Sequence, residues 1–243
     1  MTETTLYPPG WSVQRFQVVG STMDIARDLA DHDAPDRTVV RADIQTGGRG
    51  RFGRQWVSEA GNLYMTLLLR EDRPLADCAQ LSFAAALALY DAIGLPDVTL
   101  KWPNDVLIGG KKTAGILLEA GGPSAAPWIL IGMGVNVAHH PQDAPYPVTH
   151  VAQEAYPHGA DTLCRSVLEG IDHWRGIWHK QGATSIHAAW LDKAHGRGQD
   201  IRVRLTSKEI VGRFETLDAD GALVVLDKAG TRHRISAGDV FFA

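Results

Sequence analysis

The sequence predicts an α+β protein in two parts, a larger part that mixes strands with helices and a small all-β part at the C-terminal end. Strand-like apolar runs surround a long Ala/Leu-rich helical run, Cys78–Ile93. After His195-Gly-Arg-Gly the pattern changes to short strands separated by turn signals. The 243 residues suit one large domain with a small appendage. We therefore expect a mixed α/β domain over residues 1–195 and a small β-barrel over residues 196–243.

The elements of the larger part follow from hydrophobic periodicity, caps and turn residues. Strands are expected at Phe16–Val19, Thr38–Ile44, Asn62–Leu69, Val98–Trp102, Val106–Ile108, Thr113–Glu119 and Trp128–Val137. Helices are expected at Ser21–Ala30, Cys78–Ile93, Asp161–Gln181 and Thr184–Ala194. Ser21 and Thr22 are typical of a helix cap, and Gly109–Gly110 joins the strands around it into a hairpin.

The remaining segments are a long loop and the strands of the small part. His139–Tyr156 is rich in His and Pro and is expected to be a surface loop. In the small part, strands are expected at Ile201–Leu205, Gly212–Asp218, Ala222–Asp227 and Arg232–Ser236. Turn signals at Asp220–Gly221 and Ala229–Gly230 separate the later strands, as in a small barrel.

Composition excludes several classes of protein. The 24 basic and 28 acidic residues give a net charge of −4, so we expect no electrostatic attraction to DNA or to an anionic membrane. Cys78 and Cys164 are far apart in sequence, as expected in a reducing compartment. Met1–Gly10 has no signal-peptide pattern, and the longest apolar run, Leu81–Tyr90, is too short to span a bilayer. We therefore expect a cytoplasmic protein.

The segment Gln45–Trp56 is the most informative one, with four glycines and three arginines in twelve residues. Glycines let a backbone approach a ligand closely, and arginines offer forked donors to phosphate and carboxylate. Gly48–Gly53 also fits the dinucleotide-binding pattern G-x-G-x-x-G. That pattern needs a helix directly after it, whereas here the chain leads to a strand. The segment is best interpreted as a flexible clamp for a small polyanion, and a solvated basic loop is the alternative.

Three further segments carry polar residues at the ends of apolar strands. Pro103 is expected to end a strand in Lys101-Trp-Pro-Asn-Asp105, which would present Asn104 and Asp105 to a nucleotide or, through water, to Mg²⁺. An ordinary Asx turn is the equal alternative. Lys112 begins an apolar strand and could neutralise a carboxylate and a phosphate, unless it is a solvated lysine at a hairpin tip. Asn136 ends the strand Ile131-Gly-Met-Gly-Val-Asn, where it binds a ligand or caps its own loop.

Other chemistries find no support in the sequence. His139, His140 and His150 have no Cys or carboxylate at metal-ligand spacing around them, so the identity of any metal site stays unknown. Neither a Ser-His-Asp nor a Cys-His signature occurs, so no covalent acyl-enzyme is implied.

These segments, in this order, resemble the biotin protein ligases, also called biotin–[acetyl-CoA-carboxylase] ligases. The matching motifs are Gly48-Arg-Gly-Arg-x-Gly-Arg-x-Trp56, Lys101-Trp-Pro-Asn-Asp105, Lys112-x-Ala-Gly-Ile-Leu-x-Glu119 and Gly132-x-Gly-x-Asn136. The resemblance covers Val18–Val137 strongly and the barrel more loosely. It implies a mixed-sheet catalytic domain followed by an SH3-like barrel. It also implies a reaction in which biotin and MgATP give biotinyl-5′-AMP, whose biotinyl group passes to a lysine of a biotin carboxyl carrier protein.

The resemblance also implies roles for individual residues. It assigns catalysis to Lys112, Arg49 and Arg51, whose positive charges could offset the repulsion between the two reacting anions. It assigns biotin to the residues Ser21, Thr22, Met23, Gln45, Gly48, Arg49, Gly50, Arg51, Lys112 and Gly115. It assigns ATP to the residues Arg54, Trp56, Asn104, Asp105 and Asn136.

The chain departs from the family pattern at two positions. Met23 stands where many relatives have a small polar residue, which puts a side-chain hydrogen bond from that position in doubt. Phe52 replaces what is often a basic residue. The chain also starts close to the catalytic domain, so we expect no operator DNA binding.

Two other functions compete with this interpretation. A lipoate or octanoate ligase shares the fold and the acyl-adenylate chemistry. A nucleotide-binding module without catalysis would use the arginine loop as a phosphate clamp. Whether the protein is a monomer or a homodimer, and which carboxylase carries the carrier domain, do not follow from the sequence.

Overall fold

The computed structural model describes residues 7–124, 126–205 and 208–242. Residues 1–6, part of the segment in which we expected no signal peptide, lie outside this range. The larger part is built on a seven-stranded sheet. Its strands are β1 (Ser12–Val19), β2 (Thr38–Gln45), β3 (Leu63–Arg70), β4 (Val98–Lys101), β5 (Asp105–Ile108), β6 (Lys111–Gly121) and β7 (Trp128–Val135).

The sheet is mixed, as predicted. Its strand order is β1-β2-β3-β7-β6-β5-β4, with β1 parallel to β2 and the other neighbours antiparallel. The predicted hairpin is confirmed as β5 and β6, and Gly109 and Gly110 both have the positive φ that a tight two-residue turn requires. At the centre of the sheet Gly115 on β6 lies opposite Gly134 on β7, where there is room for another group to approach.

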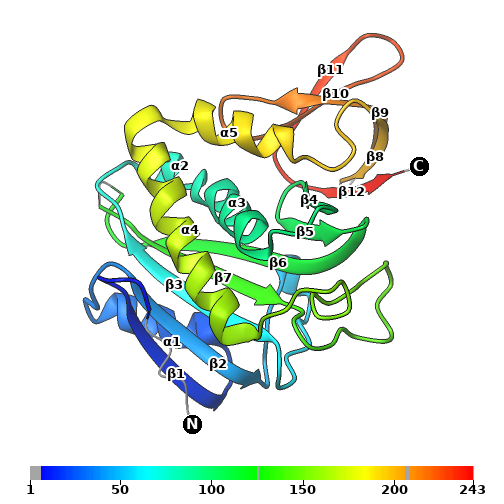
Figure 1. Ribbon diagram of the computed structural model, residues 1–243. Coiled ribbons are helices and arrows are strands. Elements are labelled where there is room, and N and C mark those ends of the chain that lie inside the picture. The colour runs from blue at the N-terminus through cyan, green and yellow to red at the C-terminus, as the bar shows by residue number, and fades with distance from the viewer. Residues whose placement is uncertain (1–6, 125, 206–207, 243) are drawn as a thin grey trace.

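Helices cover both faces of this sheet (Figure 1). They are α1 (Thr22–Asp31), α2 (Leu75–Cys78), α3 (Leu81–Ile93), α4 (Ala160–Gln181) and α5 (Ala183–Asp192), with a 3-10 turn at Arg51–Gly53. The strands alternate between the two faces because their side-chain period is two. Val39 belongs to the core beneath α3 and α4, whereas Val40 belongs to a smaller cluster with Met23 and Ala26 of α1.

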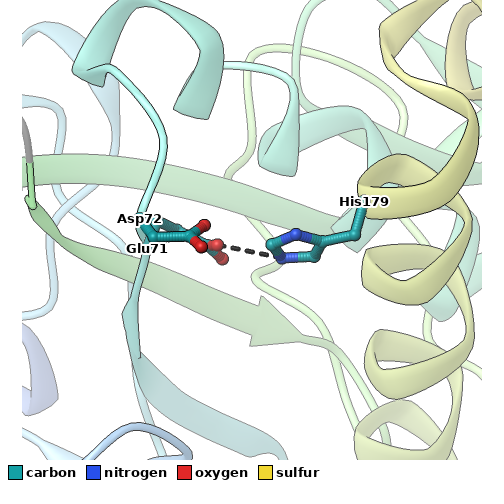
Figure 2. A group of neighbouring side chains, drawn as sticks. All are labelled: Glu71, Asp72 and His179. Atoms are coloured by element: carbon teal, nitrogen blue, oxygen red, sulfur yellow. Dashed lines mark ion pairs between the residues drawn. The ribbon is translucent and has the colours of Figure 1, made fainter.

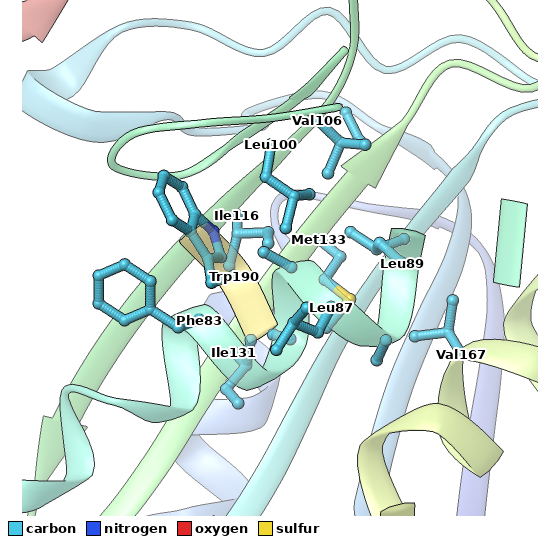
Figure 3. Packing of buried hydrophobic residues seen from close by; sticks show 14 of the residues in the cluster. Phe83, Leu87, Leu89, Leu100, Val106, Ile116, Ile131, Met133, Val167 and Trp190 are labelled. Atoms are coloured by element: carbon cyan, nitrogen blue, oxygen red, sulfur yellow. The ribbon is translucent and has the colours of Figure 1, made fainter. Parts of the chain in front are cut away.

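The main core lies between the sheet and the helices α3, α4 and α5. Figure 3 shows Leu87 and Leu89 of α3 packed against Ile116, Ile131 and Met133 of the central strands. Helix α3 is apolar on nearly every side because it is enclosed by the sheet, α4 and α5. The small alanines of this helix allow α4 to pack closely: a Cβ added at Gly170 of α4 would lie 3.0 Å from Ala88.

The C-terminal part is a five-stranded antiparallel sheet. Its strands are β8 (Asp200–Arg204), β9 (Glu209–Leu217), β10 (Leu223–Leu226), β11 (Arg232–Ile235) and β12 (Asp239–Phe242). They are arranged in the order β11-β10-β9-β8-β12, which leaves β11 and β12 as edges among the described residues. This sheet packs against the larger part: Trp102 Nε1 donates to Gly221 O at 3.1 Å, and Gln80 Nε2 donates to Asp220 O at 3.1 Å.

The structure corrects two expected elements and adds a strand that was not expected. The helix expected from Cys78 is divided, and α3 begins at Leu81. Strand β1 begins earlier than Phe16 because it is an exposed edge strand with no apolar alternation to mark its start. Strand β12 was not expected at all, since four residues are too few for a periodic pattern and only the pairing with β8 defines them.

No helix within the described ranges is both long enough and apolar enough to cross a membrane.

Candidate active site

A cavity of about 750 Å³ opens between the sheet of the larger part and the C-terminal strand β12. Its size is typical of sites that bind small molecules and cofactors. It gathers most of the residues predicted from sequence, namely Ser21, Thr22, Met23, Gln45, Arg49, Gly50, Arg51, Arg54, Trp56, Asn104, Asp105, Lys112 and Gly115. The described lining does not include Gly48 or Asn136.

One end of the cavity is a cluster of buried hydroxyl and amide groups at the start of α1. Ser21 caps the helix, and its Oγ accepts from Met23 N at 3.3 Å. The Gln45 Oε1 atom accepts from both the Thr22 backbone N at 2.9 Å and the Thr22 Oγ1 at 3.0 Å. Thr66 Oγ1 donates to Thr22 Oγ1 at 2.8 Å. A ligand head group with both donors and acceptors could exchange hydrogen bonds with this cluster.

Met23 contributes packing to this end of the cavity rather than a polar contact. Its side chain is buried, and a Cβ added at Gly132 of β7 would lie 2.8 Å from the Met23 sulfur. The Met23 thioether packs directly against the Gly132 backbone, so a side chain at position 132 would collide with it. This agrees with the doubt that the sequence raised about a hydrogen bond from position 23.

The glycine-rich segment forms a short antiparallel loop over the cavity. Gly50 N donates to Arg54 O at 2.7 Å, and Trp56 N donates to Gly48 O at 2.9 Å. The chain reverses at Phe52 and Gly53, which both have positive φ, and the Phe52 side chain is 67% exposed. A Cβ added at Gly48 would lie 2.5 Å from Trp56 O, so that glycine closes the base of the loop.

The three loop arginines have different partners. Arg49 binds both carboxylate oxygens of Asp24 on α1, at 2.6 and 3.1 Å, and these bonds lower the pKa of Asp24. Arg51 donates to Asn104 Oδ1 at 3.3 Å, and burial lowers its pKa. Arg54 donates to Asp239 of β12 at 2.8 Å. The loop is therefore tied to α1, to the β4–β5 turn and to the C-terminal sheet.

Lys112 lines the cavity. Its Nζ is 2.6 Å from Asp105 Oδ1, and the two side chains are each 17% exposed. The same ammonium group lies over the ring of Trp56, 5.4 Å from its centroid. Lys112 is therefore positioned by β6 beside a carboxylate, not in solvent, which excludes the hairpin-tip alternative. Lys111 is the solvated lysine of the pair, with a 46% exposed side chain that contacts Glu154.

Asn104 is positioned by hydrogen bonds to the neighbouring strand. Its Nδ2 donates to Ile116 O at 2.7 Å, while its backbone O accepts from Ile116 N at 2.9 Å. Its Oδ1 is left for Arg51. The turn therefore presents an oriented amide and carboxylate to the cavity, which is more than an ordinary Asx turn requires.

Gly115 and Gly134 make room for an indole. A Cβ added at Gly134 would lie 2.5 Å from Trp56 Nε1, and one added at Gly115 would lie 3.1 Å from the same ring. The Trp56 Nε1 atom is buried and has no hydrogen-bond partner. The group that approaches Gly115 in this structure is therefore Trp56, whose indole N–H is a buried donor packed against Gly134.

Replacing Gly134 with alanine is expected to displace the Trp56 indole, because 2.5 Å is far below van der Waals contact. We expect the free energy of unfolding to fall by about 1–3 kcal/mol and the indole fluorescence to shift. Urea unfolding followed by tryptophan fluorescence measures both the free energy of unfolding and the fluorescence of the folded state. Gly176→Ala is the control without a clash: an added Cβ there meets nothing within 4 Å, and helix propensity should leave this variant at least as stable as the wild type. Equal stability of the Gly134→Ala variant and the wild type would contradict this placement of Trp56.

Asn136 is buried behind the cavity. Its Nδ2 donates to Thr149 O at 3.0 Å, and its backbone N donates to Thr113 O at 2.8 Å. It therefore fastens the loop that follows β7, as the alternative interpretation expected. That loop in turn runs beside Lys112, whose N donates to Pro147 O at 2.9 Å.

Several lining residues were not assigned from sequence. Lys101 lines the cavity at the end of β4, and its position two residues before Pro103 was a signal in the sequence. Burial lowers its pKa, and its Nζ lies 5.6 Å from the Phe242 ring centroid. Tyr146 comes from the loop after β7, and its ring lies 5.4 Å from Lys112 Nζ. Arg204 and Asp239 come from the C-terminal sheet, and no local pattern could place them here.

Comparison with known proteins identifies the family. Residues 15–136 match the Biotin/lipoate A/B protein ligase family, and residues 197–243 match the Biotin protein ligase C terminal domain. The chain is 39% identical over 215 residues to a biotin–[acetyl-CoA-carboxylase] ligase of Paracoccus denitrificans, covering 84% of this chain and 89% of that protein.

Two solved structures are similar over nearly the whole chain. A biotin protein ligase from Aquifex aeolicus in complex with biotin and ATP has a TM-score of 0.77 at 25% identity, covering 95% of this chain and 97% of that one. A biotin protein ligase from Leishmania major in complex with biotinyl-5-AMP has a TM-score of 0.69 at 25% identity, covering 95% of this chain and 100% of that one. Together with the sequence matches, they show that the chain belongs to the biotin/lipoate protein ligase family and, within it, to the biotin protein ligases.

Proposed function

We propose that this protein activates biotin with ATP to biotinyl-5′-AMP and transfers the biotinyl group to a lysine of a biotin carboxyl carrier domain. The observation that carries the proposal is the charge of the cavity. Its lining holds six Lys or Arg residues and two carboxylates, in a chain whose net charge is −4. Concentrating positive charge there suits a reaction that brings a carboxylate against a triphosphate.

In the first step an oxygen of the biotin carboxylate attacks the α-phosphorus of ATP, and the bond to the β-phosphate breaks to release pyrophosphate. Arg49, Arg51 and Lys112 offset the repulsion between the two anions and stabilise the charge that develops on the phosphorus. In the second step the amine of the carrier lysine attacks the acyl carbon, and AMP leaves. Neither step needs a protein nucleophile.

The cavity offers different chemistry at its two ends. We assign the biotin ring system to the hydroxyl and amide cluster of Ser21, Thr22 and Gln45, where donors and acceptors alternate. We assign the nucleotide to the end bordered by Arg54, Trp56 and Asn104. Asn136 acts through the loop that it fastens, and Gly48 acts through closure of the arginine loop.

ATP enters as its Mg²⁺ complex, and Asp105 is the residue that fits this role. Its Oδ1 is buried, and its partner is the Lys112 Nζ at 2.6 Å, with no directed hydrogen bond to it among the described residues. Mg²⁺ is commonly held through one or two carboxylates together with the substrate phosphates. Asp105 would therefore face the metal while Lys112 turns toward the reacting carboxylate and phosphate.

We further propose that the two parts of the chain have different roles. Residues 1–195 supply the reacting cavity, and residues 196–243 cover it through β12, whose Asp239 holds Arg54 of the glycine-rich loop. The carrier partner is the biotin carboxyl carrier domain of acetyl-CoA carboxylase or a related carboxylase. The overall negative charge supports an enzyme that binds no operator DNA. We propose that it acts as a monomer or a homodimer.

The second candidate is a lipoate or octanoate ligase, since the matched family includes both activities. Biotin is favoured because residues 197–243 match the Biotin protein ligase C terminal domain. Biotin is also favoured by the polar cluster at Ser21, Thr22 and Gln45. A lipoyl or octanoyl chain has nothing that would use those donors and acceptors.

The transfer step is tested with a purified carrier domain and intact-mass spectrometry. With biotin and MgATP we expect one biotinyl group on each carrier domain, and none when the acceptor lysine is replaced with arginine. A carrier domain that acquires no biotin, or acquires it equally on the lysine-to-arginine variant, would contradict transfer to a specific lysine.

A further inference from the structure

A second polar cluster lies where β3 ends against α4, and the proposed reaction does not use it. Glu71 and Asp72 follow the last residue of β3, and His179 lies in the last turn of α4. One ligand atom from each side chain lies within 4.8 Å of the other two. Figure 2 shows the two carboxylates facing the imidazole across the gap between the strand end and the helix.

Glu71 is an unusual residue to find in this position. Its side chain is 0% exposed, and burial raises its pKa. Arg175 Nε donates to Oε1 at 2.8 Å, which satisfies one carboxylate oxygen. The other oxygen, Oε2, is buried and accepts no directed hydrogen bond from any residue that the structure describes. A buried carboxylate oxygen without a partner is costly, so this atom requires an explanation.

The neighbour of Oε2 supplies the explanation. His179 Nε2 forms an ion pair with Glu71 Oε2 at 3.0 Å when the imidazole is protonated (Figure 2), yet the two atoms do not make a directed hydrogen bond. Two atoms that bind one metal ion are related in this way, because their lone pairs point at the ion rather than at each other. Asp72 is exposed and brings a second carboxylate from the solvent side.

The charges around the cluster leave room for a cation. The Arg175 guanidinium pairs with two carboxylates, Glu71 and Asp36, at 2.8 Å each. Asp72 is a third carboxylate, so negative charges outnumber this positive charge. The nearby Arg73 guanidinium is held by other partners: it donates to the His179 backbone O and lies over the Trp178 ring. The last turn of α4 also favours positive charge, because its terminal carbonyl groups point that way.

We propose that Glu71, Asp72 and His179 form a binding site for a divalent cation of the zinc class. One imidazole and two carboxylates are ligands that suit Zn²⁺, and an imidazole disfavours Mg²⁺ and Ca²⁺. The open side at Asp72 leaves space for water to complete the coordination. Such an ion would tie the end of β3 to the end of α4 at a distance from the proposed active site.

The test is isothermal titration of the metal-free, full-length protein with ZnCl₂, and separately with MgCl₂, together with thermal unfolding. We expect one Zn²⁺ per chain, a higher midpoint of unfolding with Zn²⁺, and no comparable effect of Mg²⁺. His179→Gln and Asp72→Asn should each weaken Zn²⁺ binding by more than about tenfold. His173→Gln is the matched control, since it removes an exposed imidazole from the same helix.

Other outcomes would overturn the site. Wild-type protein that binds no Zn²⁺ would show that His179 is simply the counter-ion of Glu71. Zn²⁺ binding that survives in His179→Gln and Asp72→Asn but disappears in His140→Gln would place the ion at the His140–His150 pair, whose Nδ1 atoms are 2.8 Å apart. Because Asp72 is exposed, its variant tests the proposal even if His179→Gln fails to fold.

Discussion

Replacing Lys112 with methionine is expected to lower kcat/KM for pyrophosphate release by roughly 10²–10³-fold, the cost of removing one preorganised charge from a phosphoryl-transfer site. Lys112 lies beside Asp105 at 2.6 Å and is largely enclosed, so its charge is poorly screened by water. Methionine keeps most of the volume and removes the charge. The measurement is the initial rate of pyrophosphate release at saturating and subsaturating biotin.

Lys111→Met is the matched control for this change. Lys111 is the adjacent residue, and it contacts Glu154 with 46% of its side chain exposed. Its loss should leave the rate near that of the wild type, since exposed ion pairs contribute little. If the two variants were equally active, or equally impaired, the central role given to Lys112 would be wrong. Unfolding of both variants should be measured in parallel, because Lys112→Met leaves Asp105 without its ion pair.

Replacing Arg51 with glycine is expected to separate formation of the adenylate from its retention. Arg51 is the loop arginine that reaches across to Asn104, and burial lowers its pKa. Without it, adenylation should continue at a reduced rate, because Arg49 and Lys112 remain. The biotinyl-5′-AMP should dissociate roughly 10–100-fold faster, which corresponds to loss of a hydrogen bond made by a charged group.

The dissociation rate of biotinyl-5′-AMP measures this effect directly, and biotinylation of a bystander protein reports the released adenylate. Arg51→Ala is the matched variant, because it removes the guanidinium without the flexibility of glycine. Faster dissociation in both variants assigns retention to the guanidinium, whereas faster dissociation in Arg51→Gly alone assigns it to loop stiffness. Dissociation as slow as in the wild type in both variants would contradict a retention role for this residue.

Much of the fold could be predicted because local patterns and packing agree. The two glycines at the β5–β6 turn, the Ser21 cap and the apolar helix α3 each have a local signal that the tertiary structure uses. Strands β1 and β12 were misjudged or missed because both are edge strands whose limits are set by pairing. The open edges of the C-terminal sheet are likewise a property of the assembled strands.

The sequence predicts those residues of the candidate site that stand in a recognisable local pattern. Arg49, Arg51 and Lys112 could be recognised by their positions next to glycines or at a strand start, and the fold gathers them. The position of Asn136 behind the cavity depends on Thr149, which a strand-end argument does not include. The ion pair of Arg54 with Asp239 joins residues 185 positions apart, so no local pattern could have indicated it.

The measurement that tests the account most directly is pyrophosphate release from MgATP with biotin, lipoate and octanoate offered separately to the purified protein. We expect release with biotin alone, and its dependence on Lys112 should follow the Lys112→Met prediction. Release with lipoate or octanoate but not with biotin would keep the fold and the adenylation chemistry and contradict the substrate. If ATP binds but no pyrophosphate is released with any of the three acids, that result would contradict catalysis itself.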